Sequence, residues 1–237
     1  MKKKFNTEDS IICINPVYKT KMDVTESDLV KKHDERYNKL VKIMIDEPTN
    51  YNKIMYHAAL GGHMYIVKLM LEKGANDYND AMYYAARGGH IDIVKLMLEK
   101  GATDYNQSMC EAARYGHIDI VNLMLEKGAN NYNLSMHLAV CRCHIDIVKL
   151  MLEKGADNYN GEMFSAAGYG NIDIIKLMLE RGANDYNRTM YSAASKGHID
   201  IVKLMLEKGA DAYNQSICVA AKSGHTDIVN LIQRHKK

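Results

Sequence analysis

Tryptophan is absent from this chain of 237 residues, and proline and phenylalanine each occur only twice. Both prolines, Pro16 and Pro48, lie near the start, so none breaks a helix in the rest of the chain. Long apolar runs are also missing. The run at 11–14, Ile-Ile-Cys-Ile, is too short for the core of a signal peptide and far too short to cross a bilayer. We therefore expect an intracellular, cytoplasmic protein with no membrane segment.

Excess charge of either sign is lacking as well. The net charge is +2, which provides no overall field that would favour nucleic acid or a membrane surface. Cysteine is sparse and odd in number, and its spacing is irregular. These five residues are Cys13, Cys110, Cys141, Cys143 and Cys218. Such usage indicates reduced intracellular thiols and excludes a disulfide framework as the basis of the fold.

What the chain does contain is one motif, repeated. Residues 88–102 read Gly-Gly-His-Ile-Asp-Ile-Val-Lys-Leu-Met-Leu-Glu-Lys-Gly-Ala, and this stretch recurs with small changes. Histidine returns every 27 residues from His63 to His144 and again at His198 and His225, with Asn171 in the place between. Glycines and tyrosines keep the same interval. A fixed period of this size predicts a solenoid of stacked repeats.

The period divides the chain into three parts. A non-repeat segment, 1–24, is followed by a degenerate N-terminal capping unit, 25–50, whose polar residues suit an end repeat that has only one neighbour. Seven units then follow, at 51–77, 78–104, 105–131, 132–158, 159–185, 186–212 and 213–237.

Each unit has the signals of two short helices. In the second unit, Asn79 is predicted to be the N-cap of a helix over roughly 80–87. Gly88 and Gly89 should end that helix, with Gly89 in the left-handed conformation. A second helix is expected from about Ile91 to Lys100, because its apolar residues surround it nearly completely, as in a helix between two neighbours. The prediction is an all-α protein.

The repeated residues Ala-Ala-x-x-Gly-His-x-Asp-Ile-Val-Lys-Leu-Met-Leu-Glu-x-Gly-Ala resemble the helical half of the ankyrin repeat, over about 51–237. The usual ankyrin repeat has ~33 residues, so each unit lacks about six, in the part that builds the family's β-hairpin finger. Such fingerless units look like those of ankyrin-type proteins from giant DNA viruses of protists. The resemblance implies an ankyrin-type solenoid of helix-turn-helix repeats that binds proteins, without catalysis and without a cofactor.

Binding specificity is expected where the units differ. The two residues before the turn glycine vary most, and we call them the turn-side pairs: Leu60-Gly61, Arg87-Gly88, Arg114-Tyr115, Cys141-Arg142, Gly168-Tyr169, Ser195-Lys196 and Lys222-Ser223. The partner-binding residues predicted from them are Arg87, Arg114, Tyr115, Arg142, Tyr169, Lys196 and Lys222. The family resemblance places these pairs on the concave side, formed by the first helices. The tyrosines are side chains of the kind that dominate binding hot spots.

The hypothesis is therefore a monomeric, non-catalytic adaptor, viral in origin, whose basic and aromatic face binds a host protein that carries acidic or aromatic groups. The alternative is that the same face binds single-stranded nucleic acid or another acidic ligand, with tyrosines stacking on bases. The small net charge makes nucleic acid the poorer candidate.

Metal binding and catalysis receive little support. Helices of adjacent units are spaced about 8–10 Å apart, so histidines at equal places cannot readily share one ion. Their expected role is a hydrogen bond that fixes the turn between helices. A weak metal candidate is Cys141, Cys143 and His144, which lacks a fourth ligand nearby. We find no nucleophile–base pair and no phosphate-binding loop in the sequence.

Overall fold

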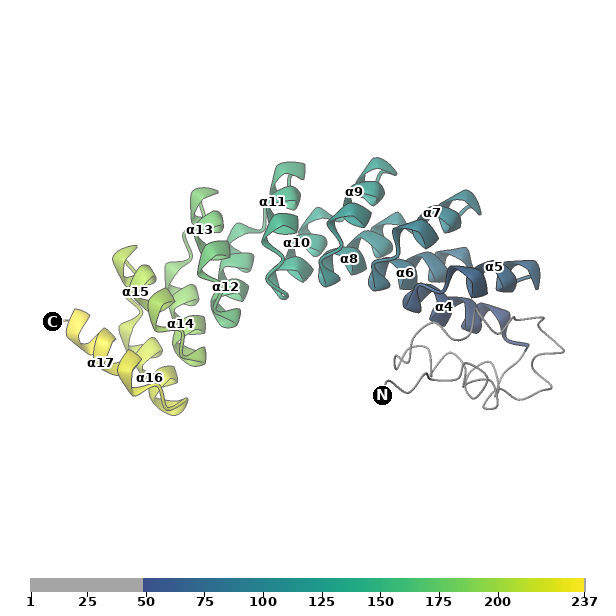
Figure 1. Ribbon diagram of the computed structural model, residues 1–237. Helices are drawn as coiled ribbons and strands as arrows, with labels where there is room; N and C mark the ends of the chain where they lie inside the picture. The colour runs from purple at the N-terminus through teal and green to yellow at the C-terminus, as the bar shows by residue number, and fades with distance from the viewer. Residues whose placement is uncertain (1–48, 237) are drawn as a thin grey trace, which may run out of the picture. The chain divides into compact units, whose positions relative to one another are not determined.

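The computed structural model describes residues 49–236, and every regular element within that range is an α-helix (Figure 1). The prediction of an all-α fold is confirmed. The predictions for segment 1–24 and for residues 25–48 of the capping unit lie outside the described residues.

Helices alternate between two kinds along the chain. The first helices each begin at a repeated tyrosine: α4 (Tyr51–Gly61), α6 (Tyr78–Gly88), α8 (Tyr105–Tyr115), α10 (Tyr132–Val140), α12 (Tyr159–Tyr169), α14 (Tyr186–Lys196) and α16 (Tyr213–Lys222). The second helices follow them: α5 (Met64–Glu72), α7 (Ile91–Glu99), α9 (Ile118–Glu126), α11 (Ile145–Lys154), α13 (Ile172–Glu180), α15 (Ile199–Glu207) and α17 (Thr226–His235).

The chain divides into two compact units, Met1–Asn130 and Asn131–Lys237. In the first, α6 packs between α4 and α8, and each first helix packs on the second helix that follows it (Figure 1). In the second, α10, α12, α14 and α16 pack in that order, again with each first helix on its own second helix. Each unit is therefore a short stack of helix pairs.

Small and flexible side chains fill the space between the helices. On α6, Met82, Ala85 and Ala86 are fully buried, and on α7 Val94 and Met97 are fully buried. The alanines allow neighbouring first helices to approach closely, while methionine adapts its shape to the remaining gaps. The same places are buried in the other repeats up to α15, which is why the repeat period predicts the core, whereas Ile217, Ala221 and Val229 of the last repeat are not buried. No helix within residues 49–236 is both long and apolar enough to cross a membrane.

The repeated asparagine does not cap its own helix, which corrects the prediction for Asn79. Helix α6 begins at Tyr78 with Asp77 as N-cap, so Asn79 lies inside the first turn. Its Oδ1 instead accepts hydrogen bonds from the backbone N–H groups of Thr103 (2.7 Å) and Asp104 (3.1 Å), just before the next first helix. Equivalent bonds are made by Asn52, Asn106, Asn133, Asn160 and Asn187. The asparagine therefore holds the end of its own unit, at the point where the chain enters the next first helix.

The turn between the two helices of a repeat is also a contact between repeats. Gly89 ends α6 with φ 81°, in the predicted left-handed conformation. Nε2 of His90 donates a hydrogen bond to the carbonyl oxygen of Leu60, 3.2 Å away in the preceding repeat. A Cβ on Gly62 would stand 2.5 Å from the His90 ring. The histidine makes a hydrogen bond at a turn between helices, as expected, and the turn that receives this bond is that of the preceding repeat.

Candidate functional site

Large hydrophobic side chains are exposed mainly along the first helices. In the described part of the chain they are Tyr115, Leu134, Tyr169 and Tyr191 on first helices, and Tyr65 and Ile118 on second helices. We call the exposed sides of the first helices, in either unit, the first-helix face. It carries most of the turn-side pairs, since these occupy the last turn of each first helix. The exposed tyrosines make it the candidate binding surface.

In the first unit, the predicted residues Arg87, Arg114 and Tyr115 are held by contacts within the face. The Arg87 guanidinium lies over the ring of Tyr115, 5.3 Å from its centroid. Nε of Arg114 pairs with Oε1 of Glu111 at 3.0 Å, one turn earlier on α8. The Glu111 carboxylate is nearly buried, so Arg114 supports the helix as well as contributing charge.

In the second unit, the predicted residues Arg142, Tyr169, Lys196 and Lys222 are all exposed. Tyr169, at the end of α12, is 54% exposed, and its hydroxyl hydrogen-bonds the half-buried thiol of Cys141. This hydrogen bond and the repulsion between thiolate and phenolate raise the pKa of Tyr169, while the positive charge of Arg142 lowers it. Arg142, Tyr169 and Cys141 therefore form one local group.

A hollow of about 400 Å³ opens on the first-helix face between α14 and α16. It is lined by Tyr191, Asn214, Gln215, Cys218, Val219 and Lys222. An apolar wall with one cation at the rim suits an apolar or aromatic side chain next to an acidic group.

Of this lining, only Lys222 was predicted from the sequence. Tyr191 and Cys218 occupy equivalent places in consecutive units, where other units carry Tyr83, His137 or Phe164. The position of Tyr191 and Cys218 varies between units, as the turn-side pairs do, and it lies one turn earlier on the same helix. This variation was the signal in the sequence that could have identified these two residues.

Three further residues meet around Cys141 in the second unit. Nδ1 of His137 lies 3.0 and 3.2 Å from the two carboxyl oxygens of Glu162, and Nδ2 of Asn158 donates to Glu162 at 3.2 Å. On the other side of the ring, Nε2 of His137 lies 3.6 Å from Sγ of Cys141. The chain Glu162–His137–Cys141–Tyr169 thus connects a buried carboxyl to an exposed hydroxyl.

An ionised Glu162 carboxylate selects the His137 tautomer that carries its proton on Nδ1. The Glu162 oxygens accept a hydrogen bond from Nδ1–H, which leaves the lone pair of Nε2 facing the Cys141 thiol. Glu162 is only 1% exposed, and burial raises the pKa of its carboxyl, although His137 and Asn158 lower it. No nucleophile–base pair was found in the sequence, whereas the structure brings the His137 ring into contact with the Cys141 thiol. The signal was the four-residue spacing of His137 and Cys141, which places both on one side of a helix.

The weak metal candidate Cys141, Cys143 and His144 does not come together as a site. No three His, Cys, Asp or Glu side chains between residues 49 and 236 are arranged to hold a metal ion. Cys141 turns toward His137 and Tyr169, whereas Cys143 is exposed with φ 62°.

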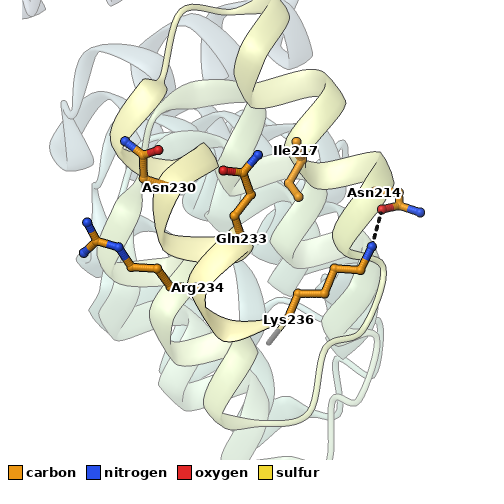
Figure 2. Close-up of a pocket in the computed structure, with 6 residues that line it drawn as sticks. All are labelled: Asn214, Ile217, Asn230, Gln233, Arg234 and Lys236. Carbon is orange, nitrogen blue, oxygen red and sulfur yellow. Dashed lines mark hydrogen bonds between the residues drawn. The ribbon is translucent and has the colours of Figure 1, made fainter.

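A second hollow, of about 660 Å³, lies at the C-terminal end of the described chain. Figure 2 shows its lining residues from α16 and α17, and they are mostly polar: Asn214, Ile217, Asn230, Gln233, Arg234 and Lys236. Nζ of Lys236 donates to Oδ1 of Asn214 at 3.0 Å, where the equivalent asparagines accept from backbone N–H groups at the end of their own units. The lysine takes the place of those donors, so we assign no binding role to this polar surface.

Comparison with known proteins agrees with this architecture. The family model for ankyrin repeats in three copies matches residues 30–109, 104–162 and 162–216. The crystal structure of the human ASB11 ankyrin repeat domain is similar, with a TM-score of 0.61 and 24% identity over 75% of this chain and 96% of that one. No curated protein matches the sequence. Ankyrin repeats are generally protein-interaction modules and not enzymes. The chain belongs to the ankyrin-repeat family.

Proposed function

We propose that this protein is a non-catalytic adaptor that binds a partner protein through the first-helix face. The exposed tyrosines there carry the proposal, because tyrosine is enriched among the residues that dominate binding energy at protein interfaces. The partner would present acidic and aromatic side chains, which suit Arg142, Lys196 and Lys222 and the hollow beside Tyr191. The resemblance of the fingerless units to those of viral ankyrin-type proteins makes a host protein the partner to search for first.

Nucleic acid is the less favoured ligand on the same face. Base stacking needs an open aromatic ring, and the Arg87 guanidinium already covers one side of Tyr115. A phosphate backbone would also require many free cations, whereas Arg114 is paired with Glu111.

The test is a pull-down from nuclease-treated host-cell lysate with the full chain. The binding variant is Tyr169→Ala/Tyr191→Ala/Lys222→Ala, which removes exposed groups from α12, α14 and α16. Arg114 is left unchanged, since its loss would leave the buried Glu111 carboxylate without its cation. The matched control is Tyr65→Ala/Ile118→Ala, which removes similarly exposed hydrophobic groups from second helices.

We expect a protein to be retained by the native chain and by the control, and lost from the binding variant. Equal retention by all three chains would contradict the assignment of the face. If binding is seen only in lysate that has not been treated with nuclease, and falls steeply as the salt concentration rises, the ligand is nucleic acid and the adaptor proposal is wrong.

A further inference from the structure

Three residues of the second unit depart from the repeat together. The place of Glu162 holds isoleucine, alanine, serine or threonine in the other units, and the place of His137 holds tyrosine, phenylalanine or cysteine. Cys141 stands where other units have leucine, arginine, glycine, serine or lysine. A carboxyl group at a buried position destabilises a stack unless it has partners, and Glu162 has His137 and Asn158.

The geometry is that of an activated thiol. A cysteine becomes nucleophilic when a neighbouring base takes its proton and a third group orients that base. Here Sγ of Cys141 lies 3.6 Å from Nε2 of His137, and the opposite nitrogen, Nδ1, is held at 3.0 Å by Glu162. The Tyr169 hydroxyl hydrogen-bonds the same sulfur and would stabilise a thiolate.

We propose that Cys141 is a modification site: a nucleophilic thiol on the first-helix face that forms mixed disulfides with low-molecular-weight disulfides. Its sulfur is half-buried and lies at the end of α10, beside the exposed side chains of Arg142 and Tyr169. A small disulfide approaching from solvent reaches it there. The inference does not depend on the adaptor function.

The reaction conserves atoms and electrons. The thiol proton of Cys141 moves to Nε2 of His137, and the thiolate attacks one sulfur of the small disulfide. The bond between the two sulfurs of that disulfide breaks as a new sulfur–sulfur bond to Cys141 forms. The departing thiolate then takes the proton from the His137 imidazolium. Cys141 is oxidised, and half of the small molecule is reduced to a thiol.

The other cysteines of the same chain supply internal references. Cys143 and Cys218 are both exposed. Cys218 occupies the position in the last repeat that is equivalent to His137, and it lines a hollow together with Lys222. Among the described residues it has no histidine contact comparable to that of Cys141. If exposure alone decided reactivity, both would react faster than the half-buried Cys141.

The experiment uses the full chain with oxidised glutathione at pH 6, followed by acid quenching, alkylation and peptide mapping. Trypsin cuts after Arg142 and separates Cys141 from Cys143. We expect Cys141 to react at least about tenfold faster than Cys143 and Cys218, because ordinary thiols are almost wholly protonated at that pH. The titratable and charged groups around it are His137, Arg142, Glu162 and Tyr169.

Variants assign the roles. The substitution His137→Phe introduces the residue type that the next unit carries at the equivalent position, Phe164. It should reduce the reaction rate of Cys141 to that of Cys143 and leave the rate of Cys218 unchanged. Glu162→Ala should lower the rate as well, and Glu162→Gln should restore most of it by again accepting from Nδ1–H. The proposal is overturned if Cys141 reacts no faster than Cys218 in the native chain, a comparison that requires no variant to fold. It is also overturned if His137→Phe, with its thermal midpoint retained, leaves the Cys141 rate unchanged.

Discussion

Cys143 and Asn171 occupy the two positions at which a glycine and a histidine meet in other repeats. A Cβ on Gly62, Gly89, Gly170 or Gly197 would stand 2.5–2.7 Å from the histidine ring of the following repeat. Cys143 carries such a Cβ and keeps the left-handed backbone, with φ 62°. Asn171 replaces the ring, and its Oδ1 accepts from the N–H of Ile174 in its own helix at 3.1 Å. The two substitutions are therefore sterically compatible as a pair.

Cys143→Gly should stabilise the protein. A left-handed conformation costs an L-residue roughly 1–2 kcal/mol, and the greater freedom of glycine in the unfolded chain offsets about half of this. We expect a gain of about 0.5–1 kcal/mol in the free energy of unfolding, measured in urea. A loss of stability would show that the thiol makes contacts that outweigh the backbone strain.

Asn171→His should destabilise the native chain, because the imidazole would meet the Cβ of Cys143. Overpacking of this kind costs about 1–3 kcal/mol. In the double variant Cys143→Gly/Asn171→His most of that loss should disappear, since the usual glycine–histidine pair is rebuilt. The measurement is a double-mutant cycle from urea unfolding, and strictly additive effects would exclude the steric relationship.

Asn160→Ala should weaken the end of the fifth repeat, where the chain enters the sixth. Oδ1 of Asn160 accepts from the N–H groups of Asn184 (2.8 Å) and Asp185 (2.9 Å), and water can replace it only in part. We expect a loss of about 1 kcal/mol in urea unfolding. Asn160→Asp is the control: it retains the acceptor oxygen and should lose clearly less. Equal losses would mean that these bonds do not hold the repeats together.

The effect of Glu162→Gln on the free energy of unfolding should become more favourable as pH rises. Burial raises the pKa of the Glu162 carboxyl above its value in the unfolded chain, so the folded state binds the proton more tightly. Its contribution to stability is complete below the unfolded pKa, near 4.5, and is lost as pH rises through the folded pKa. Glutamine does not titrate. The free energy of unfolding of Glu162→Gln, relative to the native chain, should therefore increase between about pH 4 and pH 8.

Urea unfolding at several pH values, with acid-stable buffers and constant ionic strength, measures that difference. The groups that face Glu162 are His137 and Asn158, and both are kept in the variant. A difference that stays constant with pH, or decreases, would show that the His137 contact outweighs burial and keeps the carboxylate ionised.

Several features of the fold could be predicted from the sequence because they depend on neighbours along the chain. Gly89 ends α6 in the left-handed conformation as predicted, since no other residue type adopts it at so little cost. The helix pairs follow from the spacing of apolar residues within each period. The exposed tyrosines of the turn-side pairs, Tyr115 and Tyr169, were found in the same way, from places that vary between units.

Other features could not be predicted, because the interacting groups lie far apart along the chain. Asn79 has the side chain of an N-cap, and only the folded helix pair brings Thr103 N–H within 2.7 Å of it. Likewise, Glu162 turns the ring of His137 toward Cys141 from the next helix pair.

The sequence by itself therefore determined the period, the helices and the turns, which are local matters of backbone preference and hydrophobic spacing. The tertiary structure decided which polar groups pair across repeats, because a side chain near two possible partners takes the one that packing places within reach.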